Sequence, residues 1–342
     1  MRAFTNILLV FLFTACTSVP DERMTSYVDF PETRELTART LSLDSALFRY
    51  PYRVRVQDDK AVVLDLHGTE YFFHAFHYPG FHYLSSFGKR GDAPEEMLSA
   101  ENLRWNGNFL WTLDSNKSEL TRLGFASSGD SLLRLEAVSL DEELLRALDF
   151  VQYDDSTFII PDYSGDGRFC LVSRQGKLLR KIGTVPTANE DALKSARPAL
   201  AQAWRSFIDY NPRNGVLAAA TQLGEVLEIY NLKDSTHIVR IGPNGEPEFQ
   251  ISQGYGIPIG IMGFSDIQVT DSAIYVVFQG RAFKDIMQKA QQGINLPDGG
   301  QNIYVFSLEG KPLRKYVLDH YIHGISVDEQ KGIIIATDVN KD

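Results

Sequence analysis

Three of the chain's seven histidines lie within nine residues of one another, in the stretch FFHAFHYPGFHY. Imidazole nitrogens are common metal ligands, so His74, His77 and His82 are candidates for a metal site. The residues on either side of YPGF alternate as in the two strands of a hairpin, which places His74 and His77 on opposite faces. The three therefore cannot share one metal. We expect His77 and His82 to form a cross-strand pair on an outer rim, without a metal.

A second group of possible ligands consists of aspartates that follow apolar, strand-like runs, namely Asp65, Asp114, Asp162 and Asp338. A ring of carboxylates can bind calcium. However, an aspartate at the end of a strand commonly accepts hydrogen bonds from backbone amides of the next turn. We favour this structural interpretation, with calcium as the alternative. The sequence also contains no G-x-S-x-G or H-E-x-x-H motif, so no catalytic residue, metal site or cofactor is predicted.

The aspartates belong to a repeat of about 50 to 60 residues, in which an apolar strand is followed by a polar turn and an alternating strand. Its anchor positions are Asp65, Asp114, Asp162, Thr221, Gln279 and Asp338. A repeat of this length with about four strands per unit is typical of a β-propeller. Six anchors predict an all-β, six-bladed β-propeller, built mostly of four-stranded antiparallel blades.

Two segments that follow expected outer strands carry a family resemblance. FGKRGDAPEE (87–96) and IGPNGEPEF (241–249) look like the blade-linking segments of six-bladed propellers of the TolB-like and NHL-like group. The resemblance extends over residues 36–342, which we expect to form the propeller. It implies the fold and leaves the activity open, because propellers include lactonases, peptidases and binding modules.

The last repeat, GIIIATDVN, is followed by too few residues to form outer strands of its own. The segment LTARTLSLDSALF (36–48) alternates like a strand. We therefore expect an N-terminal strand from 36–48 to close the ring in the last blade, which leaves that blade with three strands or the sequence incomplete at its C-terminus.

The N-terminal segment MRAFTNILLVFLFTAC has a positive start and an apolar run too short to span a bilayer. It resembles a bacterial lipoprotein signal, with Phe13 in place of the usual leucine. The resemblance implies cleavage before Cys16 and lipidation of Cys16, hence an outer-membrane lipoprotein of the cell envelope whose side of the membrane is open. An ordinary secretory signal is the alternative. We expect residues 1–15 to be the signal peptide and 16–35 a flexible tether.

The formal net charge is -10 and no Lys/Arg-rich block occurs. Nucleic-acid binding requires a positive patch, so this class of partner is excluded, and membrane contact is expected through the lipid anchor only. Cys170 lies in the alternating run RFCLVS, which predicts a buried, unreactive thiol.

Four long segments, 88–100, 183–203, 242–262 and 280–300, fall where a propeller places the connections of one face. We call this the loop-rich face. Helix-type spacing is expected after Asn189 and around 281–293. Long loops on a rigid scaffold commonly carry function, although they can also simply plug the channel.

The sequence thus predicts a lipid-anchored binding module, with a protein, peptide or glycan as its partner on the loop-rich face. The candidate ligand-binding residues are His67, Asp114, Asn116, Asp162, Tyr163, Gln222, Tyr255, Arg281 and Asp338. The alternative function is a metal-dependent hydrolase or lactonase with its site at the channel mouth. That reaction would need Glu and Asn/Asp side chains that converge on the axis.

Overall fold

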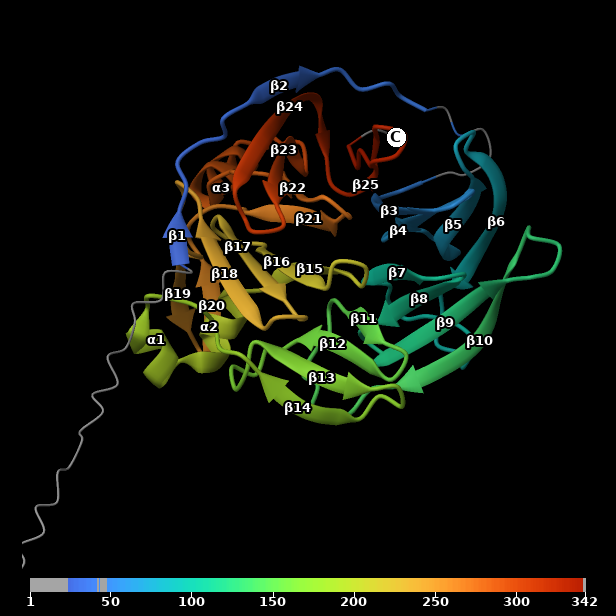
Figure 1. Cartoon of the computed structure of the whole chain (residues 1–342), viewed down its shortest axis with the longest axis horizontal. Coiled ribbons are helices and arrows are strands. Elements are labelled where there is room, and N and C mark those ends of the chain that lie inside the picture. Colours follow the sequence, from blue (N-terminus) through green and yellow to red (C-terminus); the bar gives the residue numbers. More distant parts are fainter. Residues whose placement is uncertain (1–23, 42, 44–47, 341–342) are drawn as a thin grey trace, which may run out of the picture.

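The computed structural model describes residues 24–41, 43 and 48–340. The predicted signal peptide and Cys16 lie outside these residues. In the described part of the chain, antiparallel sheets are arranged around a central axis like the blades of a propeller (Figure 1). Five of the sheets contain four consecutive strands each, ordered from the axis outward. The prediction of a β-propeller with four-stranded antiparallel blades is confirmed.

The bounds of the first three blades follow the chain. Blade one contains β3 (Pro51–Gln57), β4 (Lys60–Asp65), β5 (Tyr71–His77) and β6 (His82–Lys89). Blade two contains β7 (Asn102–Asn106), β8 (Phe109–Asp114), β9 (Glu119–Phe125) and β10 (Leu132–Ser139). Blade three contains β11 (Val151–Asp154), β12 (Thr157–Pro161), β13 (Phe169–Ser173) and β14 (Leu178–Ile182).

Two further four-stranded blades complete the regular part of the ring. Blade four contains β15 (Ser206–Asn211), β16 (Val216–Thr221), β17 (Val226–Asn231) and β18 (Thr236–Ile241). Blade five contains β21 (Phe264–Val269), β22 (Ala273–Phe278), β23 (Gly300–Ser307) and β24 (Pro312–Ile322). Every residue of β16 is buried because neighbouring blades cover both faces of a second strand, whereas an outer strand such as β18 is only half-buried.

A two-stranded sheet follows blade five, formed by β25 (Ile325–Asp328) and β26 (Ile333–Ala336). It lies against the inner strands of blades one and five. Ser326 accepts a hydrogen bond from the amide of Val56 at 3.1 Å, and the amide of Ile325 donates to Asp266 at 2.9 Å. No outer strands are added to this sheet by the described residues.

The N-terminal segment is part of the folded domain from residue 24 onward. β1 (Met24–Ser26) pairs in parallel with β18, and β2 (Thr33–Leu36) pairs in parallel with β24, at the outer edges of blades four and five (Figure 1). Between them Tyr27 and Phe30 are buried, and both rings pack against Phe306. The prediction of a flexible tether over 16–35 is therefore wrong for 24–35, because two aromatic side chains fix this segment.

The expected closing strand at 36–48 is not formed by the described residues of that segment. Leu36 ends β2, and residues 37–41, 43 and 48 lie outside any strand. Leu43 and Phe48 instead pack on an apolar cluster of blade one that also contacts Ile335 of β26. Side-chain packing, rather than a strand, therefore links the two ends of the ring here.

Two of the connecting segments contain helices, as the spacing predicts. α1 (Glu190–Ser195) begins after Asn189, whose side chain accepts a hydrogen bond from the amide of Ala192. It is followed by α2 (Arg197–Ala203), and α3 (Phe283–Gln291) lies in the 280–300 segment. A hairpin of β19 (Phe249–Ser252) and β20 (Tyr255–Pro258) occupies the 242–262 segment. No helix within the described ranges is long and apolar enough to cross a bilayer.

Candidate functional site

The aspartates at the ends of the second strands hold backbone amides. The carboxylate of Asp65 accepts hydrogen bonds from the amides of Arg49 and Tyr50 at 2.9 and 2.7 Å. In the next blade, Asp114 accepts from the amides of Leu98 and Asn116 at 2.7 and 3.0 Å. Each carboxylate thus ties the turn that follows it, or the connection that enters its own blade, to the end of the second strand.

The same arrangement recurs in blade three, where Asp162 accepts from the amides of Ser164 and Gly167 at 3.0 and 2.9 Å. The structural interpretation of these aspartates is confirmed. Their oxygens are already engaged by N–H donors, so they do not present a free set of oxygen ligands. In the described part of the chain, no group of three or more His, Cys, Asp or Glu side chains is placed to hold a metal ion.

The histidines of the first blade also lie as expected. His77 is directly opposite His82 in the register of β5 and β6. His74 is buried, and its Nδ1 lies 2.8 Å from Ser86 Oγ. One neighbour was missed by sequence reasoning, because Asp59 lies 3.6 Å from His77 across the adjacent turn.

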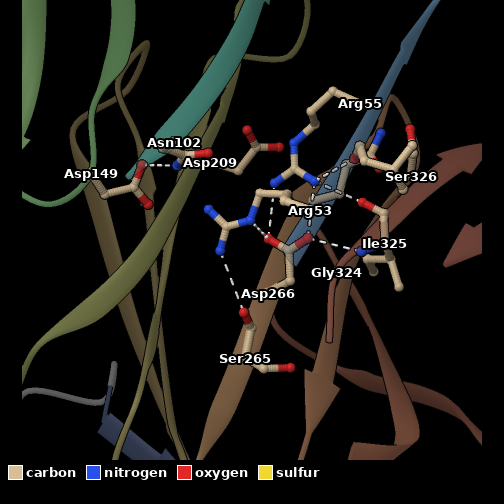
Figure 2. Close-up of polar contacts among 12 residues, drawn as sticks. Arg53, Arg55, Asn102, Asp149, Asp209, Ser265, Asp266, Gly324, Ile325 and Ser326 are labelled. Atoms are coloured by element: carbon tan, nitrogen blue, oxygen red, sulfur yellow. Dashed lines mark hydrogen bonds and ion pairs between the residues drawn. The ribbon is translucent and has the colours of Figure 1, made fainter. Parts of the chain in front are cut away.

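The axis of the ring is occupied by a buried ion-pair network, shown in Figure 2. Arg55 of β3 donates two hydrogen bonds to the carboxylate of Asp266 of β21, both at 2.9 Å. Arg53, two residues earlier on β3, brings its Nε within 3.2 Å of the same carboxylate. All three side chains are buried. Burial alone would raise the pKa of Asp266, but the two guanidinium groups outweigh it and hold this pKa far below its usual value.

A second half of the network joins blades two, three and four. Arg104 of β7 donates to Asp209 of β15 at 2.8 Å and to Asp149, which precedes β11, at 3.2 Å. Burial raises the pKa of Asp209, although Arg104 opposes this shift. With Arg53, Arg55 and Asp266, the network contains three arginines and three aspartates, so its formal charge is zero. We call these six residues the axial network.

The axial network also connects neighbouring inner strands through backbone hydrogen bonds. Asp149 accepts from the amide of Ile208 at 3.0 Å, and Asp209 accepts from the amide of Val269 at 2.7 Å. Asp266 repeats this contact with the amide of Ile325 at 2.9 Å. Donor and acceptor are 59 or 60 residues apart in all three cases, about one repeat of the chain. The axial network therefore links the inner strands of neighbouring blades, and its side chains fill the space at the axis.

Above the axial network, at the loop-rich face, lies a cluster of aromatic rings. The rings of Tyr52 and His323 are 4.3 Å apart, and those of Tyr50 and His67 are 4.7 Å apart. The hydroxyl of Tyr50 donates to Asp298, which belongs to the 280–300 segment. His67, predicted from the sequence, is thus part of an aromatic cluster that joins blade one, the β25–β26 sheet and a long loop.

Several buried polar atoms of this face have no hydrogen-bond partner of normal geometry among the described residues, among them His323 Nδ1, Tyr163 Oη and Arg205 Nε. Buried polar atoms are usually paired, so these are the atoms that a bound molecule or water could engage. The guanidinium of Arg205 lies 5.8 Å from the centre of the Tyr163 ring. Burial raises the pKa of Tyr163, which keeps its hydroxyl protonated.

The remaining predicted ligand-binding residues are distributed over the same face. Gln222 lies beside Arg205, to whose carbonyl oxygen its amide donates at 2.8 Å. Arg281 donates to the carbonyl oxygen of Gly299 at 2.7 Å and is thereby held within its own loop. Tyr255 is 60% exposed on β20.

Asn116 and Asp338 have turn-forming contacts of the type described above. The amide of Asn116 donates to Asp114, and Asp338 accepts from the amide of Asn340 at 2.9 Å. The structure therefore groups Tyr163 with Gln222 through Arg205, and leaves Tyr255 and Asp338 apart from them.

Cys170 is buried as predicted, and burial raises the pKa of its thiol to about 12.

The buried His323 predicts a pH dependence of stability. Burial lowers its pKa to about 4, so the folded chain keeps the ring neutral while the unfolded chain binds a proton near pH 6.5. The free energy of unfolding should therefore fall as the pH falls from about 6.5 to about 4, by roughly 3 kcal/mol in total. Urea unfolding at several pH values measures this slope. A His323→Phe variant should show a clearly smaller slope, because only the contribution of the likewise buried His74 remains, whereas the exposed His82→Gln control should keep the full slope. An unchanged slope in His323→Phe contradicts the assignment.

Several solved structures have a fold similar to that of this chain. Among solved structures, the chain is similar to a member of the DUF4221 family from Bacteroides vulgatus (9% identity, 87% of this chain and 90% of that chain covered, TM-score 0.54). It is also similar to a Bacteroides fragilis protein described as exported (11%, 86% and 80%, 0.51) and to a streptogramin B lyase (11%, 87% and 93%, 0.51). At such identities the similarity shows the fold alone. Among curated proteins, none matches this sequence.

The sequence itself carries the family relationship. The sequence profile of the family described as TolB-like 6-blade propeller-like matches residues 29–330, which is most of the chain. The matched range includes Phe30 and all five four-stranded blades, and it ends in the turn between β25 and β26. The resemblance seen in the blade-linking segments is thus confirmed, and this chain belongs to the TolB-like 6-blade propeller-like family.

Proposed function

We propose that this chain is a lipid-anchored propeller of the bacterial cell envelope that binds a protein, peptide or glycan through its loop-rich face. The observation that carries the proposal is the way three long segments pack on one another at that face. The amide of Met262 donates to the carbonyl oxygen of Arg281 at 2.8 Å, and the amide of Phe283 donates to that of Gly260 at 3.0 Å. The amide of Ala188 donates to Glu246 at 3.0 Å.

These contacts build a continuous surface over blades four and five from segments that are far apart in the sequence. Beneath it the axial network keeps the inner strands in fixed positions. A rigid scaffold with an elaborated face is suited to recognition, because little conformational entropy is lost when a partner docks. The envelope location is supported by the signal-like N-terminal segment, in which Cys16 is the expected lipidation site.

The ring is proposed to have six blades, with β25 and β26 as the inner strands of the sixth. The contact from Asp266 to Ile325 supports this number, since it repeats the contacts that join blade three to blade four and blade four to blade five. The β25–β26 sheet also stands between blade five and blade one, where a closing blade is required.

The hydrolase alternative is less well supported. It would use carboxylates at the strand ends or at the axis, and these already bind backbone amides or arginines. A fold shared with a streptogramin B lyase does not transfer a reaction.

The binding proposal predicts that shortening one long loop weakens partner capture without unfolding the ring. None of the side chains of α3 is buried, so replacement of residues 284–293 by a short Gly/Ser linker should change the melting temperature by no more than about 2 °C. Affinity capture from a detergent extract of the envelope should retain less partner with this variant. The matched control carries His77→Ala with His82→Ala on the outer rim and should capture normally. Capture that is lost in the control and kept in the loop variant contradicts the proposal.

A further inference from the structure

The outer edge of blade two is not covered by any strand of the described residues. β10 is the last strand of its sheet and lies at the outer rim (Figure 1), whereas β1 and β2 cover the outer strands of blades four and five in parallel. The pairing of β10 with β9 is irregular between Arg134 and Glu136 and regular over 136–139. β2 likewise pairs with four residues of a strand that has irregular pairing elsewhere. Blade two therefore presents the kind of edge that this chain covers elsewhere with an added strand.

The ladder between β9 and β10 shows which backbone groups of β10 point outward. The amide of Leu140 donates to the carbonyl oxygen of Ser118 at 2.7 Å, in continuation of the antiparallel register of the two strands. Bonded pairs alternate along such a ladder, so Val138 also bonds to β9. The amides of Ala137 and Ser139, both exposed residues, therefore point away from the sheet and are free to pair with an added strand.

A groove of about 680 Å³ adjoins this edge. It is lined by residues 136–139 of β10, by the link that follows, 140–143, and by Arg174, Gln175 and Lys177 of the β13–β14 turn. The amide of Asp141 donates to the carbonyl oxygen of Gly176 at 2.8 Å, which fixes this turn against the link. A strand added to β10 would therefore lead its next residues into a groove that is already formed.

Blade four shows how the equivalent place is filled by the chain itself. Directly after β1, the amide of Tyr27 donates to the carbonyl oxygen of Ile241, the last residue of β18, at 2.9 Å. The side chain of Tyr27 is buried, and its hydroxyl donates to Glu225 at 2.7 Å. The residue that follows an added strand thus inserts beside the end of the outer strand. In blade two, the groove lies at this position.

The charges of the groove indicate the chemistry of an occupant. Four acidic and two basic residues line it, which gives a formal charge of -2. Glu136 is paired with Arg174 at 2.8 Å, and Asp141 lies 3.7 Å from Lys177. The excess negative charge therefore comes from the exposed pair 142–143, and a Lys or Arg side chain of a partner complements it.

We propose that β10 is a docking edge for an extended peptide segment of a partner protein, which adds as a fifth, parallel strand along 136–139. The first half of the segment carries apolar side chains at alternate positions, near Leu133 and Leu135, which are 53% and 48% exposed. A Lys or Arg follows, where the segment enters the groove beside Glu142 and Glu143. Backbone hydrogen bonds supply affinity in this mode, and side chains supply specificity. The docking edge is separate from the loop-rich face and does not depend on the lipid anchor.

Selection of heptapeptides from a random library on the purified full chain tests this inference. Peptides that also bind an Ala137→Pro variant are first removed. Proline lacks the outward N–H and leaves the bonds to β9 intact, so the melting temperature should change by no more than about 2 °C. We expect enriched sequences in which alternating apolar residues precede Lys or Arg. No enrichment, or enriched sequences without this order, overturns the inference.

The strongest enriched peptide is then synthesised with a fluorescent label, and its affinity is measured by anisotropy. Glu142→Gln with Glu143→Gln should weaken binding about fivefold, because the complementary charge is removed. The matched control, Glu70→Gln with Glu309→Gln, removes the same charge at exposed positions of blades one and five and should leave the affinity unchanged. Equal affinity of the 142–143 variant and the unchanged chain contradicts the proposed orientation of the segment.

Hydrogen exchange locates the bound peptide independently. Binding should slow amide exchange in 136–139, and protection confined to the loop-rich face overturns the inference. Self-association that Ala137→Pro abolishes, without any enriched peptide, assigns the edge to a second copy of the chain and also overturns it. If Ala137→Pro does not fold, the Glu142→Gln, Glu143→Gln chain replaces it in the removal step, with the same expected and contradicting results.

Discussion

An Asp266→Ala variant is expected to lose about 3–5 kcal/mol of the free energy of unfolding. The substitution leaves the guanidinium groups of Arg53 and Arg55 buried without their shared carboxylate, and removes the acceptor for the amide of Ile325. Guanidinium chloride titration followed by tryptophan fluorescence measures the change. Because Asp266 joins blade five to the β25–β26 sheet and to blade one, the loss should be visible as unfolding of the whole ring.

The matched control for Asp266 is an exposed ion pair of the same chemistry. Asp271 pairs with Arg213 at 2.7 Å, with side chains 49% and 76% exposed. Asp271→Ala should cost at most about 1 kcal/mol. Equal losses in the two variants would contradict the role given to the axial network. Lowering the pH should not remove the contribution of Asp266 to the free energy of unfolding until about pH 4. The pKa of Asp266 is about 3.9 in the unfolded chain and far lower in the folded chain, so this contribution is lost only as the pH falls below about 4.

The second prediction with a large expected effect concerns where the protein is found in the cell. A Cys16→Ser variant is expected to move from the membrane fraction to the soluble fraction, because acyl chains that each contribute about 0.8 kcal/mol per buried CH₂ are no longer attached. Fractionation of cells followed by immunoblotting measures this shift. A Cys170→Ala control, at a buried position of β13, should remain with the membranes. A Cys16→Ser chain that is still cleaved at residue 16 and membrane-bound would contradict lipidation.

The repeat was predictable from the sequence because its anchors serve local turns. Asp65 and Asp114 each bind amides within 16 residues along the chain, so every blade must carry its own anchor at the same place. The N-terminal strands were not predictable in this way. Tyr27 and Phe30 lie in the polar, proline-containing segment 16–35, where nothing local indicates that they are buried. Their partners lie far along the chain, in blade five and at Glu225.

The axial network escaped sequence reasoning for a related reason. Arg55 and Asp266 are 211 residues apart, and nothing local indicates that they meet. A signal did exist, since the inner strands YRVRVQ and FSDIQV contain charged residues within otherwise apolar strands. Side chains alternate along a strand, so charges at such positions in innermost strands point toward an axis where they must be paired. His67, which lies in the aromatic cluster, was named because it follows a strand end, whereas His323 has no such signal.

The parallel strands β1 and β2 impose an order on assembly. The partners of this segment are synthesised very late, since Thr25 meets Arg240, 215 residues away, and Glu32 meets Arg314, 282 residues away. The first residues of the described domain to be made are thus among the last to reach their places, after blades four and five exist. Until then the outer edges of β18 and β24 are open to other strands, and a nascent chain stalled before blade five would carry an unplaced N-terminal segment able to pair with the β18 edge of a neighbouring molecule.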